Sequence, residues 1–235
     1  MKPLAQPAET SEERIMNRIE FTFAGQCLSA LGSGALWWPD QKLLCVSDLH
    51  LGKSERMARR GGPTLPPYDS RETLTRLATD LSLTDASTVI CLGDSFDDLD
   101  ASAGLATEDK LQITALQAGR RWIWIEGNHD PGPVEMGGAH LFEWVYNGLV
   151  FRHIAQPDGQ GEVSGHYHPK VKLTTRAGAI SRPAFLLDHT RMILPAYGTY
   201  TGGLRSSDAA LTRIMAPGAR AILTGVHPQL VPMPG

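Results

Sequence analysis

The stretch that decides the fold is Lys42-Leu43-Leu44-Cys45-Val46-Ser47-Asp48-Leu49-His50-Leu51-Gly52-Lys53. Its apolar first half follows Ala35-Leu36-Trp37-Trp38 and the turn Pro39-Asp40-Gln41, and this order predicts a β-hairpin. A carboxylate and an imidazole, Asp48 and His50, come directly after the second strand. The stretch therefore predicts a buried strand that ends in polar side chains suited to chemistry.

The same rhythm continues through the first half of the chain. Residues 88–92 and 121–125 are short apolar runs that predict buried strands. A helix is expected before each of them, one opened by the capping box Asp69-Ser70-Arg71-Glu72 and one over residues 108–118. With the alternating strand Ile19, Phe21, Phe23, this pattern predicts an α/β sheet built from crossovers.

The second half of the chain is richer in short β-like segments. They are separated by Gly, Pro and Asp, and they cover residues 149–153, 171–175, 184–187, 192–194 and 219–223. We expect them to form a second sheet that packs on the first. The sequence has no internal repeat and no low-complexity linker, so we predict a polar tail over residues 1–18 and a single domain over residues 19–235.

Composition excludes several classes of protein. The 235 residues are 42% hydrophobic and 20% charged, which is typical of a globular chain. The net charge of −3 excludes a uniformly basic nucleic-acid-binding surface. No apolar run approaches the ~18 residues of a membrane span, and the start lacks the apolar core of a secretory signal. The three cysteines form no CxxC pair, so we expect buried, reduced thiols and a cytoplasmic protein.

Further polar residues follow the other apolar segments. They are Asp94 in Gly93-Asp94-Ser95-Phe96-Asp97, Asn128 and His129 in Gly127-Asn128-His129-Asp130, His153 after residues 149–152, and His166 and His168 in Gly165-His166-Tyr167-His168-Pro169. Ligands bind α/β sheets at the carboxyl ends of strands. The glycines before Asp94, Asn128 and His166 permit sharp turns. We therefore expect all these side chains to converge in one crevice.

The chemistry of this set is specific. Two carboxylates, an amide oxygen and several imidazoles suit a pair of divalent first-row metals such as Mn²⁺, Fe²⁺ or Zn²⁺, and not a sulfur-rich zinc site. Two ions ~3.5–4 Å apart need a shared ligand, which Asp94 can provide. A water between them would be deprotonated near neutral pH and could attack a phosphate in line. His129 then has the role of general acid.

The ordered motifs resemble the calcineurin-like metallophosphoesterase superfamily. Within it, the chain is most similar to the ligase-associated DNA-damage-response endonuclease family PdeM, on the residues 48–53, 165–169 and Leu194-Pro195-Ala196-Tyr197-Gly198-Thr199-Tyr200-Thr201-Gly202-Gly203. This resemblance extends from about Phe21 to the C-terminus.

The resemblance implies a four-layer α/β/β/α sandwich of two mixed sheets around a dinuclear metal centre. It places Asp48, His50 and His168 on one ion and Asn128, His153 and His166 on the other, with Asp94 bridging and His129 catalytic but outside the metal shell. Asp97 receives no metal. The implied activity is manganese-dependent cleavage of DNA in repair, with a ligase or a helicase as possible partners and no membrane association.

Some alternatives stay open. The enzyme could be a phosphatase or pyrophosphatase for a small or lipid-linked phosphoester, which predicts a narrow pocket or an apolar lid, or an inactive scaffold of the same fold. His153 could be a packed strand-end histidine, and His129 could be a structural partner of Asp130. The basic residues Lys53, Arg56, Arg59 and Arg60 could be a solvated helix face or line the approach to the metals. Tyr197 and Tyr200 could be exposed and contact substrate.

Overall fold

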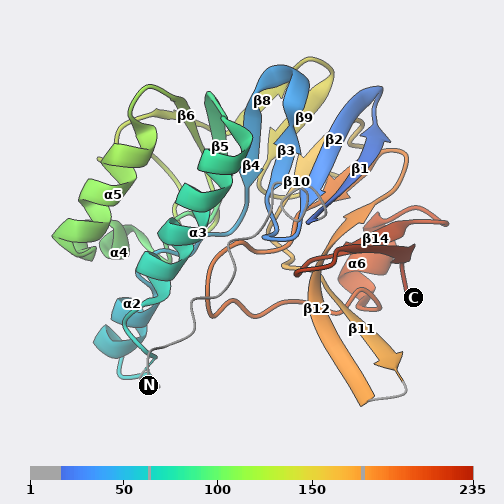
Figure 1. Ribbon diagram of the computed structural model, residues 1–235. Helices are drawn as coiled ribbons and strands as arrows, with labels where there is room; N and C mark the ends of the chain where they lie inside the picture. Colours follow the sequence, from blue (N-terminus) through green and yellow to red (C-terminus); the bar gives the residue numbers. More distant parts are fainter. Residues whose placement is uncertain (1–16, 63–64, 176–177, 235) are drawn as a thin grey trace, which may run out of the picture.

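The computed structural model describes residues 17–62, 65–175 and 178–234. Two mixed β-sheets face each other, with helices α3 and α5 beside the first sheet and α6 beside the second (Figure 1). The predicted α/β fold, a four-layer α/β/β/α sandwich of two mixed sheets, is confirmed. Residues 1–16 of the predicted polar tail lie outside the described residues.

The first sheet contains seven strands in chain order. They are β1 (Arg18–Phe23), β2 (Gln26–Leu31), β3 (Leu36–Trp38), β4 (Leu43–Val46), β5 (Thr88–Leu92), β6 (Arg121–Ile125) and β7 (Ala139–Leu141). The strands β1 to β4 are antiparallel, and the 3₁₀ helix η1 (Pro39–Gln41) forms the predicted turn between β3 and β4. From β4 to β7 the strands are parallel, so their carboxyl ends share one edge.

The helices α3 (Asp69–Thr84) and α5 (Thr107–Gln117) cover this sheet, with the short helices α2 (Lys53–Arg59) and α4 (Leu99–Gly104) near its edge. The predicted capping box of α3 is wrong. Asp69 accepts a hydrogen bond from the backbone N–H of Ser54 (3.1 Å), and the Ser70 hydroxyl accepts one from the N–H of Gly52 (2.8 Å). These two side chains therefore accept backbone N–H groups at the start of α2. The N-cap residue of α2, Gly52, has no side chain that could do so.

The second sheet has the order β15 (Gln229–Pro232), β14 (Arg220–Leu223), β12 (Gly178–Leu187), β13 (Arg191–Ile193), β10 (Glu162–Ser164), β9 (Leu149–Arg152) and β8 (Glu143–Tyr146). The strand β11 (Lys170–Thr175) pairs with β12 as a long hairpin that projects from the body (Figure 1). Only β13, β10 and β9 run parallel to one another. The outer face is covered by α6 (Ala209–Ile214).

Three buried apolar clusters hold the layers together. The largest lies between the two sheets and includes Trp38 and Phe151. A second packs the first sheet against its helices, and a third packs the second sheet against α6. Cys45 and Cys91 are buried as predicted, but Cys27 is exposed, because it lies on the solvent side of the edge hairpin β1–β2. Within the described residues, no helix is long and apolar enough to span a membrane.

Candidate metal centre

The predicted ligands lie at the carboxyl ends of five strands. Asp48 and His50 follow β4, Asp94 follows β5, Asn128 follows β6, His153 follows β9, and His166 and His168 follow β10. The first three strands belong to one sheet and the last two to the other. The loops of both sheets therefore contribute to one site, and the three-residue strand β10, which the sequence did not reveal, carries two of its histidines.

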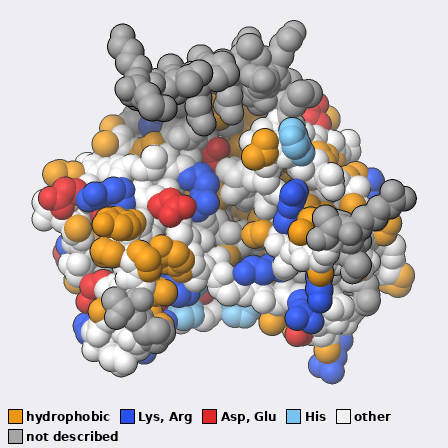
Figure 2. Space-filling model, turned by 60° about the horizontal axis from the view of Figure 1, so that its bottom comes forward, with side chains coloured by type: hydrophobic (Ala, Val, Ile, Leu, Met, Phe, Trp, Pro, Cys, Tyr) orange, Lys and Arg blue, Asp and Glu red, His pale blue; other side chains and the backbone are white. Residues whose placement is uncertain are grey.

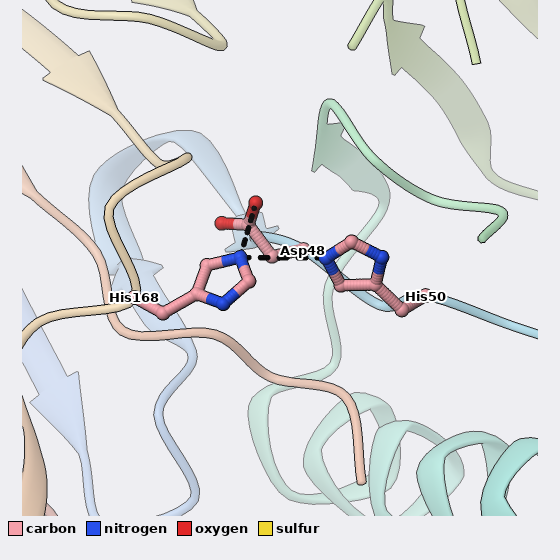
Figure 3. Close-up of side chains that lie close together, drawn as sticks. All are labelled: Asp48, His50 and His168. Atoms are coloured by element: carbon pink, nitrogen blue, oxygen red, sulfur yellow. Dashed lines mark hydrogen bonds and ion pairs between the residues drawn. The ribbon is translucent and has the colours of Figure 1, made fainter. Parts of the chain in front are cut away.

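Asp48, His50 and His168 form the first cluster (Figure 3). Asp48 Oδ1 is 3.0 Å from His168 Nε2, and the Nε2 atoms of His50 and His168 are 3.3 Å apart. Asp48 and His50 are buried. The backbone N–H of His166 also donates to the Asp48 carboxylate, at 3.0 Å from Oδ2, so the loop after β10 is bound directly to the loop after β4.

Asp94, His153 and His166 form the second cluster. His153 Nε2 is 3.3 Å from Asp94 Oδ2, 3.3 Å from His166 Nδ1 and 3.1 Å from Asn128 Oδ1. The four predicted donors thus surround one point. His153 is buried with its ring aimed at this point, which favours a ligand over a residue that merely packs at the end of β9.

The two clusters meet at Asp94. Its Oδ2 atom lies 3.3 Å from His153 Nε2 of the second cluster and 3.9 Å from His50 Nε2 of the first. Asp48 Oδ1 is likewise 4.0 Å from the ring of His153. A carboxylate between two groups of imidazoles has the position that a shared ligand of two ions requires.

The donor set fits divalent cations. Imidazole nitrogens face each other at 3.3 Å in both clusters, an arrangement that a cation between them would stabilise. The opposite ring nitrogens lie beside protein oxygens: His153 Nδ1 is 3.0 Å from the carbonyl oxygen of Leu92, and His50 Nδ1 is 2.9 Å from Asp97 Oδ1. Such partners orient the ring and leave Nε2 as the donor. The clusters are therefore buried His/Asp groups typical of a dinuclear centre.

The electrostatics of the centre agree with this fit. Burial tends to raise the pKa of Asp48 and of Asp94, but their histidine neighbours outweigh it and hold both pKa values below the ordinary range. Burial tends to lower the pKa of His153, yet the hydrogen bond and charge of Asp94 and the charge of Asp48 raise it to about 9. The lowered pKa values of the two carboxylates and the raised pKa of His153 show that the centre favours positive charge beside Asp48 and Asp94, and a bound cation would supply such charge.

His129 lies beside the two clusters and remains partly open to solvent, with 34% of its side chain exposed. Its Nε2 atom is 4.0 Å from Asp94 Oδ2, and its Nδ1 atom is 2.9 Å from the carbonyl oxygen of Asp97. Asp130 is not its partner: that carboxylate accepts the N–H groups of Ser95 and Phe96, among others. His129 is thus free to face a substrate.

Asp97 is a site residue whose role the sequence did not show. Besides its contact with His50, the buried carboxylate forms an ion pair with Arg56 and lies 4.0 Å from Lys53 Nζ. The sequence feature that pointed to Asp97 was its position as the last residue of the pattern Gly-Asp-x-x-Asp. Burial tends to raise the pKa of Asp97, but His50 and the side chains of Lys53 and Arg56 hold that pKa below its ordinary value.

The basic residues of α2 are largely neutralised by acidic partners. Arg59 pairs with Glu55, Asp98 and Asp100, and Arg60 also pairs with Asp98. On the face shown in Figure 2, Lys and Arg side chains are interspersed with acidic and apolar ones. The ion pairs therefore favour the interpretation that these basic residues form a helix face with local partners. They do not favour a free positively charged approach to the metal centre.

Two glycines permit the close packing of the centre. Gly93 has φ of +76°, and a Cβ atom there would lie 2.3 Å from His153 Nδ1. At Gly165 the backbone is not left-handed, but a Cβ atom would lie 1.8 Å from Ser47 Oγ. The predicted sharp turn is therefore present at Gly93, whereas Gly165 is required because the two sheets approach closely.

The loop 194–203 is hydrogen-bonded to the backbone of the segment that carries Asp48. The N–H of Tyr197 donates to the carbonyl oxygen of Ser47 (2.7 Å), and the N–H of Gly198 donates to that of Asp48 (3.1 Å). Tyr197 is not exposed as the sequence suggested; its hydroxyl donates to Asp80 in the core (2.8 Å). Tyr200 is exposed.

Comparisons with known proteins agree with this geometry. The family model described as calcineurin-like phosphoesterase matches residues 41–224, a range that contains every predicted ligand. Among curated proteins, none matches the chain. The crystal structure of Pseudomonas putida nuclease MPE is similar, with 28% identity and a TM-score of 0.70 over 91% of this chain and 100% of that chain. The chain belongs to the calcineurin-like phosphoesterase family and is a metal-dependent phosphoesterase.

Proposed function

We propose that the protein is a dinuclear-metal-dependent phosphodiesterase that cuts DNA. The observation that carries this proposal is the meeting of two buried His/Asp clusters at Asp94, with His129 beside them and open to solvent. The similarity to a nuclease of Pseudomonas putida supports a nucleic acid as the substrate.

Each residue of the centre has a role in this proposal. Asp48, His50 and His168 would hold one cation; Asn128, His153 and His166 would hold the other, and Asp94 would contact both. Two bound cations supply an activated water and neutralise charge on the phosphate. His129, when protonated, donates from Nε2 to the leaving oxygen, because the Asp97 carbonyl holds its Nδ1 and orients the ring.

Manganese is the cation we propose first, because carboxylate and imidazole donors suit it, although the same donors accept iron or zinc. The cytoplasm is the compartment we propose, since the three cysteines are free thiols. For a DNA-repair setting, with a ligase or helicase as partner, the support is the resemblance to the PdeM endonucleases.

Metal analysis and a substrate panel test the proposal together. The purified protein is analysed for bound metals, then assayed with Mn²⁺ on single- and double-stranded DNA and on small aryl phosphate mono- and diesters. We expect two equivalents of metal and cleavage of DNA. Cleavage of small aryl diesters without cleavage of any nucleic acid would overturn the DNA substrate.

A phosphatase or pyrophosphatase for a small phosphoester is the second candidate. The observation in its favour is a cavity of about 300 Å³ that is lined by Asn128 and His153. This candidate predicts faster hydrolysis of phosphomonoesters or pyrophosphates than of any diester in the same panel. The inactive scaffold is disfavoured, because every predicted ligand is present and clustered.

A further inference from the structure

The cavity beside the second cluster has an unusual wall. Besides Asn128 and His153, it is lined by Phe142, Ile154 and Pro131. Phe142 is 71% exposed, whereas its neighbours Leu141 and Trp144 pack against the core between the sheets. Ile154 of the same wall is also exposed, so the two side chains form an apolar patch at a cavity, and such patches mark ligand-binding grooves.

Backbone hydrogen bonds fix this wall relative to the proposed ligands. The N–H of Glu126, two residues before Asn128, donates to the carbonyl oxygen of Leu141 (2.9 Å), which places Phe142 beside the loop after β6. Ile154 directly follows His153, whose carbonyl oxygen accepts the N–H of Gly165 (2.9 Å). The segments that carry the apolar wall are therefore hydrogen-bonded to the loops that carry the proposed ligands.

The surface of the cavity is mainly apolar, although five of its nine lining residues are polar. Arg152 is paired with Glu143 (2.9 Å), and its side chain is 20% exposed. Glu126, Gly127 and Gln156 are the remaining residues of the lining. A cavity of about 300 Å³ is at the lower end of small-molecule sites, which suits one flat ring system and its sugar better than a long chain.

We infer that this cavity binds the nucleobase next to the phosphodiester bond that is cut, with Phe142 as the stacking surface. The inference rests on the proposed function and specifies its substrate contact. A base presents a flat π-face, and stacking on an aromatic side chain tolerates any base sequence. Glu126 and Gln156 are polar residues of the same lining.

Three small substrates with a single labile bond test the inference. Thymidine 5′-(p-nitrophenyl phosphate) and thymidine 3′-(p-nitrophenyl phosphate) carry a base on one side or the other, and methyl p-nitrophenyl phosphate carries none. For Phe142→Ala we expect KM to rise about 5- to 100-fold on one thymidine ester with little change in kcat. On the methyl ester we expect KM to stay within about twofold.

Two further variants serve as controls. Phe142→Trp keeps an aromatic face and should restore the KM of the wild type. Val145→Ala removes an exposed apolar side chain of β8 that does not line the cavity. This variant should leave KM unchanged for all three substrates. Thermal unfolding of all variants confirms that Phe142→Ala remains folded, as expected for an exposed position.

A binding measurement is independent of turnover. In the His129→Ala background, an oligonucleotide with 2-aminopurine should lose fluorescence on binding, and Phe142→Ala should reverse that loss. Equal KM changes on the thymidine and methyl esters, or unchanged 2-aminopurine quenching, would overturn the base site while leaving the phosphodiesterase proposal intact. Failure of the wild type to hydrolyse any nucleotide ester or nucleic acid would overturn both.

Discussion

The residues of the centre have strained backbones as well as specialised side chains. Five of them combine a left-handed backbone with a bulky or polar side chain, with φ between 45° and 71°: Asp48, His50, Asp94, His166 and His168. Such conformations cost roughly 1–3 kcal/mol each and persist only where the surroundings hold them. Here the hydrogen bonds between loops and the close glycine contacts provide that support.

Replacement of His129 separates chemistry from metal binding. In His129→Ala we expect both metal equivalents to remain and turnover to fall ~10²–10⁴-fold, because a positioned proton donor is lost and no proposed ligand is removed. Metal content by mass spectrometry and kcat with DNA check this. Loss of metal from the variant would show that His129 is itself a ligand.

Replacement of Asp97 tests a positioning role. Asp97→Ala removes the group that lies 2.9 Å from His50 Nδ1, so His50 loses its orientation. We expect metal affinity to fall about 10- to 100-fold and activity to recover at high Mn²⁺ concentration. Asp100→Ala removes an exposed carboxylate of the neighbouring α4 and is the matched control. Activity that does not recover with added Mn²⁺ would contradict a role through His50.

At the scale of elements, short loops rather than helices set the relative position of the strands. Asp188, in the turn between β12 and β13, illustrates this. Its Oδ1 accepts the N–H groups of Thr190 (2.7 Å) and Arg191 (3.0 Å), and its Oδ2 accepts that of Ala216 after α6 (2.7 Å). One carboxylate therefore joins a sheet to the helix that covers it.

The stability of the protein should depend on pH through this carboxylate. Burial tends to raise the pKa of Asp188, but the backbone hydrogen bonds outweigh it and keep the pKa below its ordinary value. The ionised form therefore stabilises the fold above the ordinary pKa, and this contribution is lost as the pH falls through the lowered pKa. We expect Asp188→Asn to lower the free energy of unfolding by ~1–2 kcal/mol at pH 7, with a smaller difference in acid, once the pH has fallen through the lowered pKa.

Urea unfolding at both pH values measures this effect. Asp85→Asn is the matched control, because Asp85 is an exposed residue paired only with exposed Lys42. An equal loss of stability for Asp188→Asn at neutral and acidic pH would contradict the role of the charge.

At the scale of the whole molecule, the centre joins two sheets that otherwise meet through apolar packing. Asp48, His50 and Asp94 come from the first sheet, and His153 and His168 from the second. Ligands that bind the folded state alone stabilise it by mass action. Bound cations should therefore hold the two halves of the sandwich together.

Metal addition should raise the thermal stability. At a Mn²⁺ concentration of about 100 times Kd, one site contributes about 2.7 kcal/mol, which corresponds to a rise in Tm of roughly 5–10 °C. In Asp94→Ala, which lacks the carboxylate between the clusters, we expect no comparable rise, no loaded metal and no activity. Calorimetry with and without a chelator measures the shift. The same rise in both proteins would contradict Asp94 as a shared ligand.

Much of the fold followed from local patterns. The run 43–46 and its polar followers Asp48 and His50 predicted a buried strand with a functional end, because alternation and apolar runs depend on neighbouring residues only. The three-residue strand β10 has no measurable period and was missed. Asp69 looked like a cap for its own helix, but a carboxylate can accept an N–H from any nearby element, and that of Ser54 was in reach.

The sequence by itself determined which side chains are available and the strands that carry them, because each motif is contiguous and follows an apolar run. Only the tertiary structure decided that Asp94 stands between the clusters, that Asp97 lies beside His50, that Tyr197 is buried and that Phe142 borders the second cluster. The physical reason is distance along the chain: these contacts join segments that are far apart in the sequence, and their geometry is set by how the strands and sheets pack. No local pattern contains that information.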